Sequence, residues 1–139
     1  MIEKIYINAD GGARRNPGSA AIGIIIYDEN GNLLEKYKER VGDTTNNVAE
    51  YTAVLMALQR AKELGASSVH LRMDSELVQR QMTGVYRVKQ PHLQTIFLQI
   101  QRLMQDFVRV SFEHVRREKN KRADELANEA MDRGQPKRS

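Results

Sequence analysis

The chain has 139 residues and a formal net charge of +4, from 22 Lys and Arg against 18 Asp and Glu. It contains no cysteine, which excludes disulfides, thiolate zinc sites and cysteine nucleophiles. The length suits one domain with a sizeable core, and no apolar run is long enough to cross a membrane.

The first part of the chain predicts three strands. Apolar and polar residues alternate over 3–10, the segment 20–28 is strongly apolar and β-branched, and a third strand is expected over 33–41. A turn rich in Gly, Asn and Pro separates the first two strands, and Asn30-Gly31 is a hairpin signal before the third. Three antiparallel strands are therefore expected to open the domain.

A long helix is expected next, over 44–65, with Asn46 or Asn47 as its N-cap. Gly65 stands where such a helix ends. The later segments predict, in order, a strand at 67–74, helices at 75–82 and 92–107, a strand at 108–115 and a last helix at 123–134. Helical crossovers usually join parallel strands, so the order βββαβααβα predicts an α/β fold with a mixed sheet.

Four acidic residues each begin or end a predicted element and point toward apolar surroundings: Asp10, Glu50, Asp74 and Asp124. Inward carboxylates repel one another and lose hydration, so a fold that gathers them needs a cation to offset the charge. Strand-to-helix junctions of one sheet are where sites in such folds form. An oxygen-only ligand set selects Mg²⁺ or Mn²⁺ over zinc or copper.

Each of these acids has an ordinary structural alternative. Asp10 precedes two glycines and suits a turn, and Glu50 completes a capping box with Asn47. Asp74 suits the N-cap of the helix after it, and Asp124 suits the first turn of a helix, where the dipole favours negative charge. Each alternative can account for one acid taken alone. Together the alternatives do not explain why all four acids are expected at one edge of the sheet.

Positive charge gathers beside the acids. The run RREKNKR at 116–122 comes immediately before Asp124, and Arg14 and Arg15 follow Asp10. Basic groups beside acidic metal ligands suit a polyanionic substrate better than an acidic protein partner.

The segments that carry the four acids resemble type 1 ribonuclease H. They read, in order, YINADGGARRNPGSAAIG, TTNNVAEYTAVLMAL, VHLRMDSELV and REKNKRADELAN. The resemblance implies the ribonuclease H fold, a five-stranded mixed sheet with its first three strands antiparallel and helices on both faces. It also implies hydrolysis of the RNA strand of an RNA–DNA hybrid. The domain is then expected over 1–134, with a disordered tail over 135–139.

The same resemblance implies roles for individual residues. The four acids would hold two metal ions, one activating the attacking water and the other stabilising the departing 3′ oxygen, which leaves 5′-phosphate and 3′-hydroxyl ends. Contacts to the substrate are implied for Gly11, Gly12, Asn16, Thr45, Asn46, Ser75 and Lys89. Those near the 2′-hydroxyls distinguish RNA from DNA. Asn16 has a plain alternative as a turn residue in Asn-Pro-Gly.

The sequence departs from the family pattern in two places. Many bacterial members carry a mobile histidine in the loop before the last acid, whereas the shorter RREKN here has none. Glu118 is the accessory candidate in that loop, for metal exchange or product release. The basic protrusion of many members is also missing, as in compact forms of the family. Arg87, Lys89 and the run at 116–122 are expected to replace part of its charge.

The N-terminus reads as a strand rather than a signal peptide, so a cytoplasmic protein is expected, and a monomer. Two other functions remain open. One is a non-catalytic module that binds hybrids. The other is the same chemistry on double-stranded RNA, because contacts to 2′-hydroxyls tolerate a second RNA strand.

Overall fold

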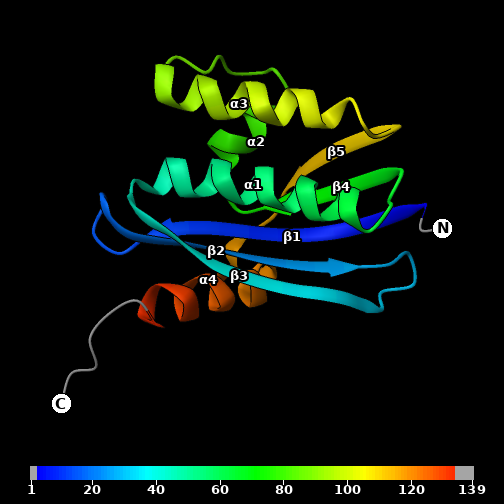
Figure 1. Cartoon of the computed structure of the whole chain (residues 1–139), viewed down its shortest axis with the longest axis horizontal. Helices are drawn as coiled ribbons and strands as arrows, with labels where there is room; N and C mark the ends of the chain where they lie inside the picture. Colours follow the sequence, from blue (N-terminus) through cyan, green and yellow to red (C-terminus); the bar gives the residue numbers. More distant parts are fainter. Residues whose placement is uncertain (1–2, 134–139) are drawn as a thin grey trace.

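A computed structural model describes residues 3–133 of the chain (Figure 1). The elements in this range are β1 (Lys4–Ala13), β2 (Gly18–Tyr27), β3 (Leu33–Thr44), α1 (Asn46–Glu63), β4 (Ser68–Met73), α2 (Glu76–Met82), α3 (Pro91–Met104), β5 (Arg109–His114), the short 3-10 helix η1 (Arg117–Lys119) and α4 (Lys121–Arg133). The expected order of strands and helices is confirmed. The tail predicted over 135–139 lies outside the described residues.

All five strands form one mixed sheet in the order β3-β2-β1-β4-β5. β2 pairs antiparallel with both β1 and β3, whereas β4 pairs parallel with both β1 and β5. The predicted directions are therefore confirmed, for the opening antiparallel strands and for the later parallel ones. β1 is the central strand, and the strands β4 and β5, which continue the sheet in parallel, lie on one side of it.

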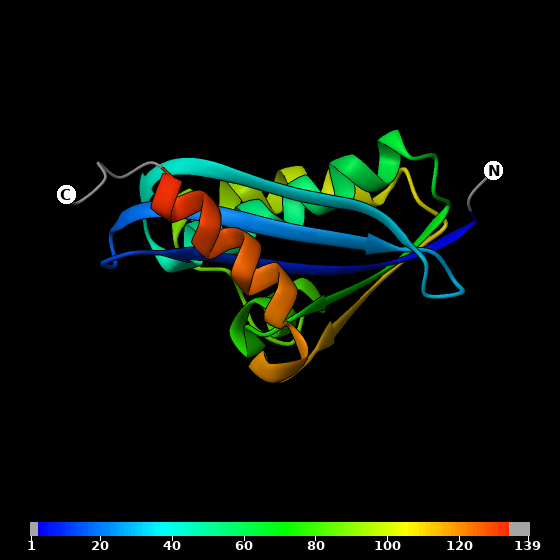
Figure 2. The same cartoon turned by 90° about the horizontal axis from the view of Figure 1, so that it is seen from below.

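The helices cover both faces of the sheet. α1, α2 and α3 lie on one side and α4 crosses the other (Figures 1 and 2). The main core fills the space between α1 and the sheet, where Ile5, Ile7 and Leu58 are fully buried. Each such side chain stabilises the fold by about 2 kcal/mol. A smaller apolar cluster contains Ala21, Ala127, Ala130 and Met131, of β2 and α4.

The helix N-termini differ from two of the expectations. The hydroxyl of Thr45 accepts a bond from the Val48 N–H at 3.2 Å, so Thr45 caps α1 in place of Asn46 or Asn47. Glu50 then lies beyond the capping-box position, and that alternative for it is wrong.

The second helix corrects the alternative proposed for Asp74. Ser75 is the N-cap of α2, because its hydroxyl accepts a bond from the Val78 N–H at 3.3 Å. Both acids are thus relieved of a capping role and remain available for chemistry. Gly65 follows α1 with a φ of +78°, as expected for a glycine that ends a helix.

Two glycines let helices approach the centre of the sheet more closely than any side chain would allow. A Cβ on Gly11 would lie 2.2 Å from the carbonyl oxygen of Ala49 in α1, and one on Gly23 would lie 2.1 Å from that of Ala123 in α4. Gly23 pairs with Asp10 across β1 and β2. The helices that carry the second and fourth acids are therefore seated beside the first.

A side chain at position 11 should push α1 away from β1. Gly11→Ala is expected to lower the free energy of unfolding by roughly 1–3 kcal/mol, because its Cβ meets backbone that cannot move aside. Gly12→Ala is the matched control, since the nearest atom to its Cβ is the Asn46 Oδ1 at 3.9 Å. Urea unfolding measures both variants, and equal stabilities would contradict the close-packing role of Gly11.

Candidate active site

The structure brings the four acids together at one pocket of about 200 Å³, whose lining includes all four. Asp10 lies within β1, Glu50 in the second turn of α1, Asp74 directly after β4 and Asp124 in the first turn of α4. All four are half-buried. Acids from segments far apart in the sequence therefore share one small, partly desolvated volume.

The pKa of the Asp10 carboxyl is raised from 3.8 to about 9, chiefly by burial. The negative charge of Asp74, a hydrogen bond with Asp124 and the charges of Asp124 and Glu50 contribute to the same rise, in that order. Two carboxyl groups can share a hydrogen bond only if one of them carries a proton. Without a cation, Asp10 is therefore neutral near pH 7.

Glu50 is balanced between opposing influences. Burial and the negative charge of Asp74 raise its pKa, whereas a hydrogen bond from Ser75 and the positive charge of Arg117 lower it. Burial is the largest of these effects, and the resulting pKa is about 7. Ser75 thus has two tasks, since its hydroxyl caps α2 and also orients the Glu50 carboxylate.

The donor set of the pocket fits a divalent cation that prefers oxygen. Its lining contains four carboxylates and no histidine or cysteine among the described residues. In the same part of the chain, no three acidic, histidine or cysteine side chains form a group that could hold a metal ion as they stand. A cation among the carboxylates would offset the repulsion that raises two of their pKa values. Their assignment as metal ligands stays a prediction.

Two asparagines tie the end of β1 and the loop after it to the start of α1. Asn46 Oδ1 accepts a bond from the Ala13 N–H at 2.8 Å, and Asn16 Oδ1 accepts one from the Asn46 N–H at 3.0 Å. Asn46 lines the pocket together with Gly11 and Gly12. Because the amide oxygens are used within the protein, the NH₂ groups are the ends suited to a ligand.

The other candidate residues lie farther out. Thr45 is exposed at the N-cap of α1, and Lys89 is exposed in the loop 83–90 between α2 and α3. Glu118 is exposed in η1. None of these three lines the pocket. Their roles stay predictions.

The structure adds residues that the sequence did not single out. Arg117 and Asn128 line the pocket, and buried Asn120 donates to an oxygen of Asp74 at 3.4 Å. Arg117 is part of the basic run at 116–122, and the sequence does not indicate which cation of that run lies at the pocket. Asn120 and Asn128 lie four residues to either side of Asp124, a helical spacing that was a usable signal for Asn128.

A family model described as reverse transcriptase-like matches residues 8–130. RNase H1 from the archaeon Halobacterium salinarum has the same fold with a TM-score of 0.91. The two sequences are 38% identical over 94% of this chain and 98% of that one. The chain belongs to the type 1 ribonuclease H family. Enzymes of this ribonuclease H family depend on a divalent metal.

Two further relatives extend the comparison. LC11-RNase H1, isolated from compost, is 49% identical with a TM-score of 0.89, and the alignment covers 94% of this chain and 98% of that one. Its structure is that of a complex with an RNA/DNA hybrid. A bifunctional protein of Mycobacterium tuberculosis is 43% identical over 93% of this chain. The chain spans 36% of that protein's length.

The chain has the compact form of this family. Within the described residues, only the loop 83–90 joins α2 to α3, where a protrusion would stand. The described part of the chain also contains no helix long and apolar enough to cross a membrane.

Without metal, the free energy of unfolding is expected to fall as the pH rises. The folded chain keeps a proton on Asp10 up to a pKa of about 9, against 3.8 for an ordinary carboxyl, so this stabilisation is complete below 3.8 and is lost toward 9. Glu50 adds a change of the same sign up to its pKa of about 7.

Asp10→Asn removes the larger titration. At neutral pH and in EDTA the variant should be more stable than the wild type by roughly 1–3 kcal/mol. Its stability should also depend less on pH. Urea unfolding from about pH 5 to about pH 8 measures both slopes. A wild-type curve no steeper than that of the variant would contradict the electrostatic description.

Proposed function

We propose that this chain is a metal-dependent endoribonuclease that hydrolyses the RNA strand of RNA–DNA hybrids, leaving 5′-phosphate and 3′-hydroxyl ends. The observation that carries the proposal is the convergence of Asp10, Glu50, Asp74 and Asp124 on one pocket in a ribonuclease H chain. The hybrid-bound structure of LC11-RNase H1 supports the choice of substrate. A cytoplasmic monomer remains the expected form.

The four acids would hold two Mg²⁺ or Mn²⁺ ions. When bound, such a pair lowers the pKa of a water nucleophile and stabilises the leaving oxygen. The chain's own task is to keep the four carboxylates oriented and partly dry. Ser75 serves this by its bond to Glu50, and Gly11 by admitting α1 beside β1.

RNA would be distinguished from DNA by amide donors at the rim. The NH₂ groups of Asn16 and Asn46 are suited to 2′-hydroxyls or to the backbone beside them, because the amide oxygens are already bound to main-chain N–H groups. Gly12 leaves the main chain open to a close approach at the same place. The hydroxyl hydrogen of Thr45 is available to a phosphate, since its oxygen already accepts the capping bond.

The DNA strand would be met by the loop 83–90. Two glutamines hold this loop by its carbonyls. Gln81 donates to the Arg87 oxygen at 3.4 Å, and Gln94 donates to the Val88 oxygen at 2.9 Å. Buried Val88 anchors the loop, which leaves Arg87 and Lys89 exposed. A fixed loop with two cations is a small substitute for a basic protrusion.

A gel assay on end-labelled duplexes tests the proposal. The wild type should cut only the RNA strand of a hybrid, with Mg²⁺ or Mn²⁺ and not with EDTA. Asp10→Asn should fold and lose the cleavage, because it removes a ligand charge. Binding without cleavage in either metal would favour a non-catalytic module, and cleavage of double-stranded RNA would change the substrate.

The loop before α4 offers a comparison of neighbouring residues. Arg117 lines the pocket and its charge lowers the pKa of Glu50, so Arg117→Gln should reduce kcat/KM by about 10-fold or more, as expected for a charge beside a phosphate. Glu118→Gln tests the accessory role predicted for that residue. Steady-state kinetics on the hybrid measure both, and unchanged kinetics of Glu118→Gln would remove Glu118 from the mechanism.

A further inference from the structure

A single buried amide contacts the segments that carry three of the four acids. Asn120 lies between η1 and α4 and is 1% exposed. Among the described residues, Gln81 is the other polar side chain that is buried. Removing an amide from water costs free energy unless its donors and its acceptor are bonded. The partners of Asn120 therefore show what its burial serves.

Those partners belong to the active site. Asn120 Nδ2 donates to the Ala9 carbonyl oxygen at 2.9 Å and to Asp74 Oδ2 at 3.4 Å. Ala9 directly precedes Asp10 in β1. The main-chain oxygen of Asn120 accepts a bond from the Asp124 N–H at 3.1 Å. The residue thus joins β1, the carboxylate after β4 and the first turn of α4.

The orientation of this amide is fixed by the Ala9 carbonyl oxygen, which can only accept, and it is reinforced by Asn8 and Arg72. Arg72 Nη1 donates to Asn8 Oδ1 at 3.4 Å, and Asn8 Nδ2 donates to Asn120 Oδ1 at 3.1 Å. A guanidinium can only donate, and the Lys119 carbonyl oxygen, which accepts from Asn8 Nδ2 at 3.3 Å, can only accept. Asn8 therefore turns its oxygen to Arg72 and its NH₂ group to Asn120. Asn120 must then present its oxygen to Asn8. Its own NH₂ group is left facing Asp74.

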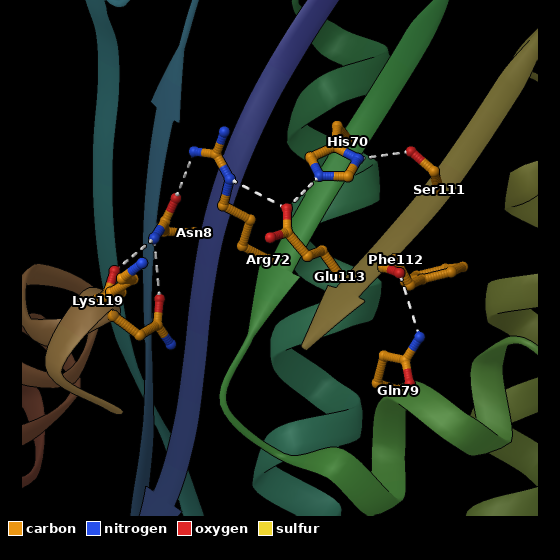
Figure 3. A network of polar contacts seen from close by, with 9 residues as sticks. Asn8, His70, Arg72, Gln79, Ser111, Phe112, Glu113 and Lys119 are labelled. Carbon is orange, nitrogen blue, oxygen red and sulfur yellow. Dashed lines mark hydrogen bonds and ion pairs between the residues drawn. The ribbon is translucent and has the colours of Figure 1, made fainter. Parts of the chain in front are cut away.

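Arg72 is itself fixed by a chain of contacts on the face of the sheet opposite α1 (Figure 3). Its Nε lies 3.7 Å from Glu113 Oε1, and the same oxygen lies 2.6 Å from His70 Nε2. His70 Nδ1 lies 2.7 Å from the Ser111 hydroxyl. The contacts run from edge strand β5 through β4 to β1, and they end at an acid of the active site.

We propose that Asn120 is a positioning residue for the metal site, oriented by the Ala9 carbonyl and, through Asn8, by Arg72. It holds one oxygen of Asp74 and leaves the other for a cation, while its main chain fixes the start of the helix that carries Asp124. The inference rests on the proposed function, because it assigns the acids to a metal. It adds a residue that meets neither the cation nor the substrate.

The test measures Mn²⁺ binding by calorimetry, together with kcat and KM on a hybrid. Asn120→Ser should weaken Mn²⁺ binding by about 10–100-fold, as is usual when a residue that supports a metal ligand is lost. It should lower kcat more than it changes KM. Asn120→Asp should weaken Mn²⁺ binding more than Asn120→Ser does, because a carboxylate cannot donate to Asp74 and adds a like charge beside it.

Ile100→Ala is the control for a general loss of stability. Ile100 is fully buried in α3 and does not line the pocket. Its variant should lose stability in thermal unfolding and keep the wild-type affinity for Mn²⁺. Wild-type affinity and kcat in Asn120→Ser would overturn the proposal. So would an equal loss of affinity in Ile100→Ala.

A second pair of variants keeps the test decisive if the Asn120 variants do not fold. Arg72→Lys keeps a group that only donates, whereas the amide in Arg72→Gln can accept as well and removes the constraint that Arg72 places on Asn8. Weaker Mn²⁺ binding in Arg72→Gln than in Arg72→Lys supports the contribution of Arg72 to the orientation, and equal affinities overturn it.

The same experiment separates this inference from the proposed function. A wild type that binds Mn²⁺ and cuts no hybrid would refute the proposed function. The role of Asn120 would still be decided by the Mn²⁺ affinities of the variants.

Discussion

The active site depends on backbone meeting backbone at the centre of the sheet. Gly11 admits the start of α1 and Gly23 admits the start of α4, from opposite faces, on either side of Asp10. A Cβ at either position would meet the main chain of the helix and push that helix away from the sheet. The placement of Glu50 and Asp124 follows from that contact.

This arrangement partly buries four carboxyl groups, and burial disfavours their charged form. Burial and mutual repulsion raise the pKa of Asp10 and Glu50, so the metal-free site holds a proton that an exposed carboxylate would release. The apolar layer beneath α1 supplies the stability that this requires, because Ile5, Ile7 and Leu58 lie fully buried beside the acids' own elements. A site destabilised in this way favours a cation over further hydration.

Sequence patterns predicted the features that follow from the periodicity of strands and helices. They failed for features that depend on contacts between residues far apart in the sequence or on a choice among neighbouring caps. Alternation in β1 fixed which side of the sheet Asp10 faces, and the four motifs located the acids. The N-cap of α1 was misassigned because Thr45, Asn46 and Asn47 are all capable caps. The role of Asn120 depends on partners more than 40 residues away in sequence, Ala9 and Asp74, and no local pattern announces such contacts.

The order of the acids along the chain has a consequence for biosynthesis. Asp10, Glu50 and Asp74 are made first, but the pocket is closed only by α4, which supplies Asp124 and packs over strands made near the start. A nascent chain still lacking this helix on the ribosome has an exposed β2 surface and an incomplete site. Under the proposed function, nuclease activity therefore requires α4 to be docked on the sheet.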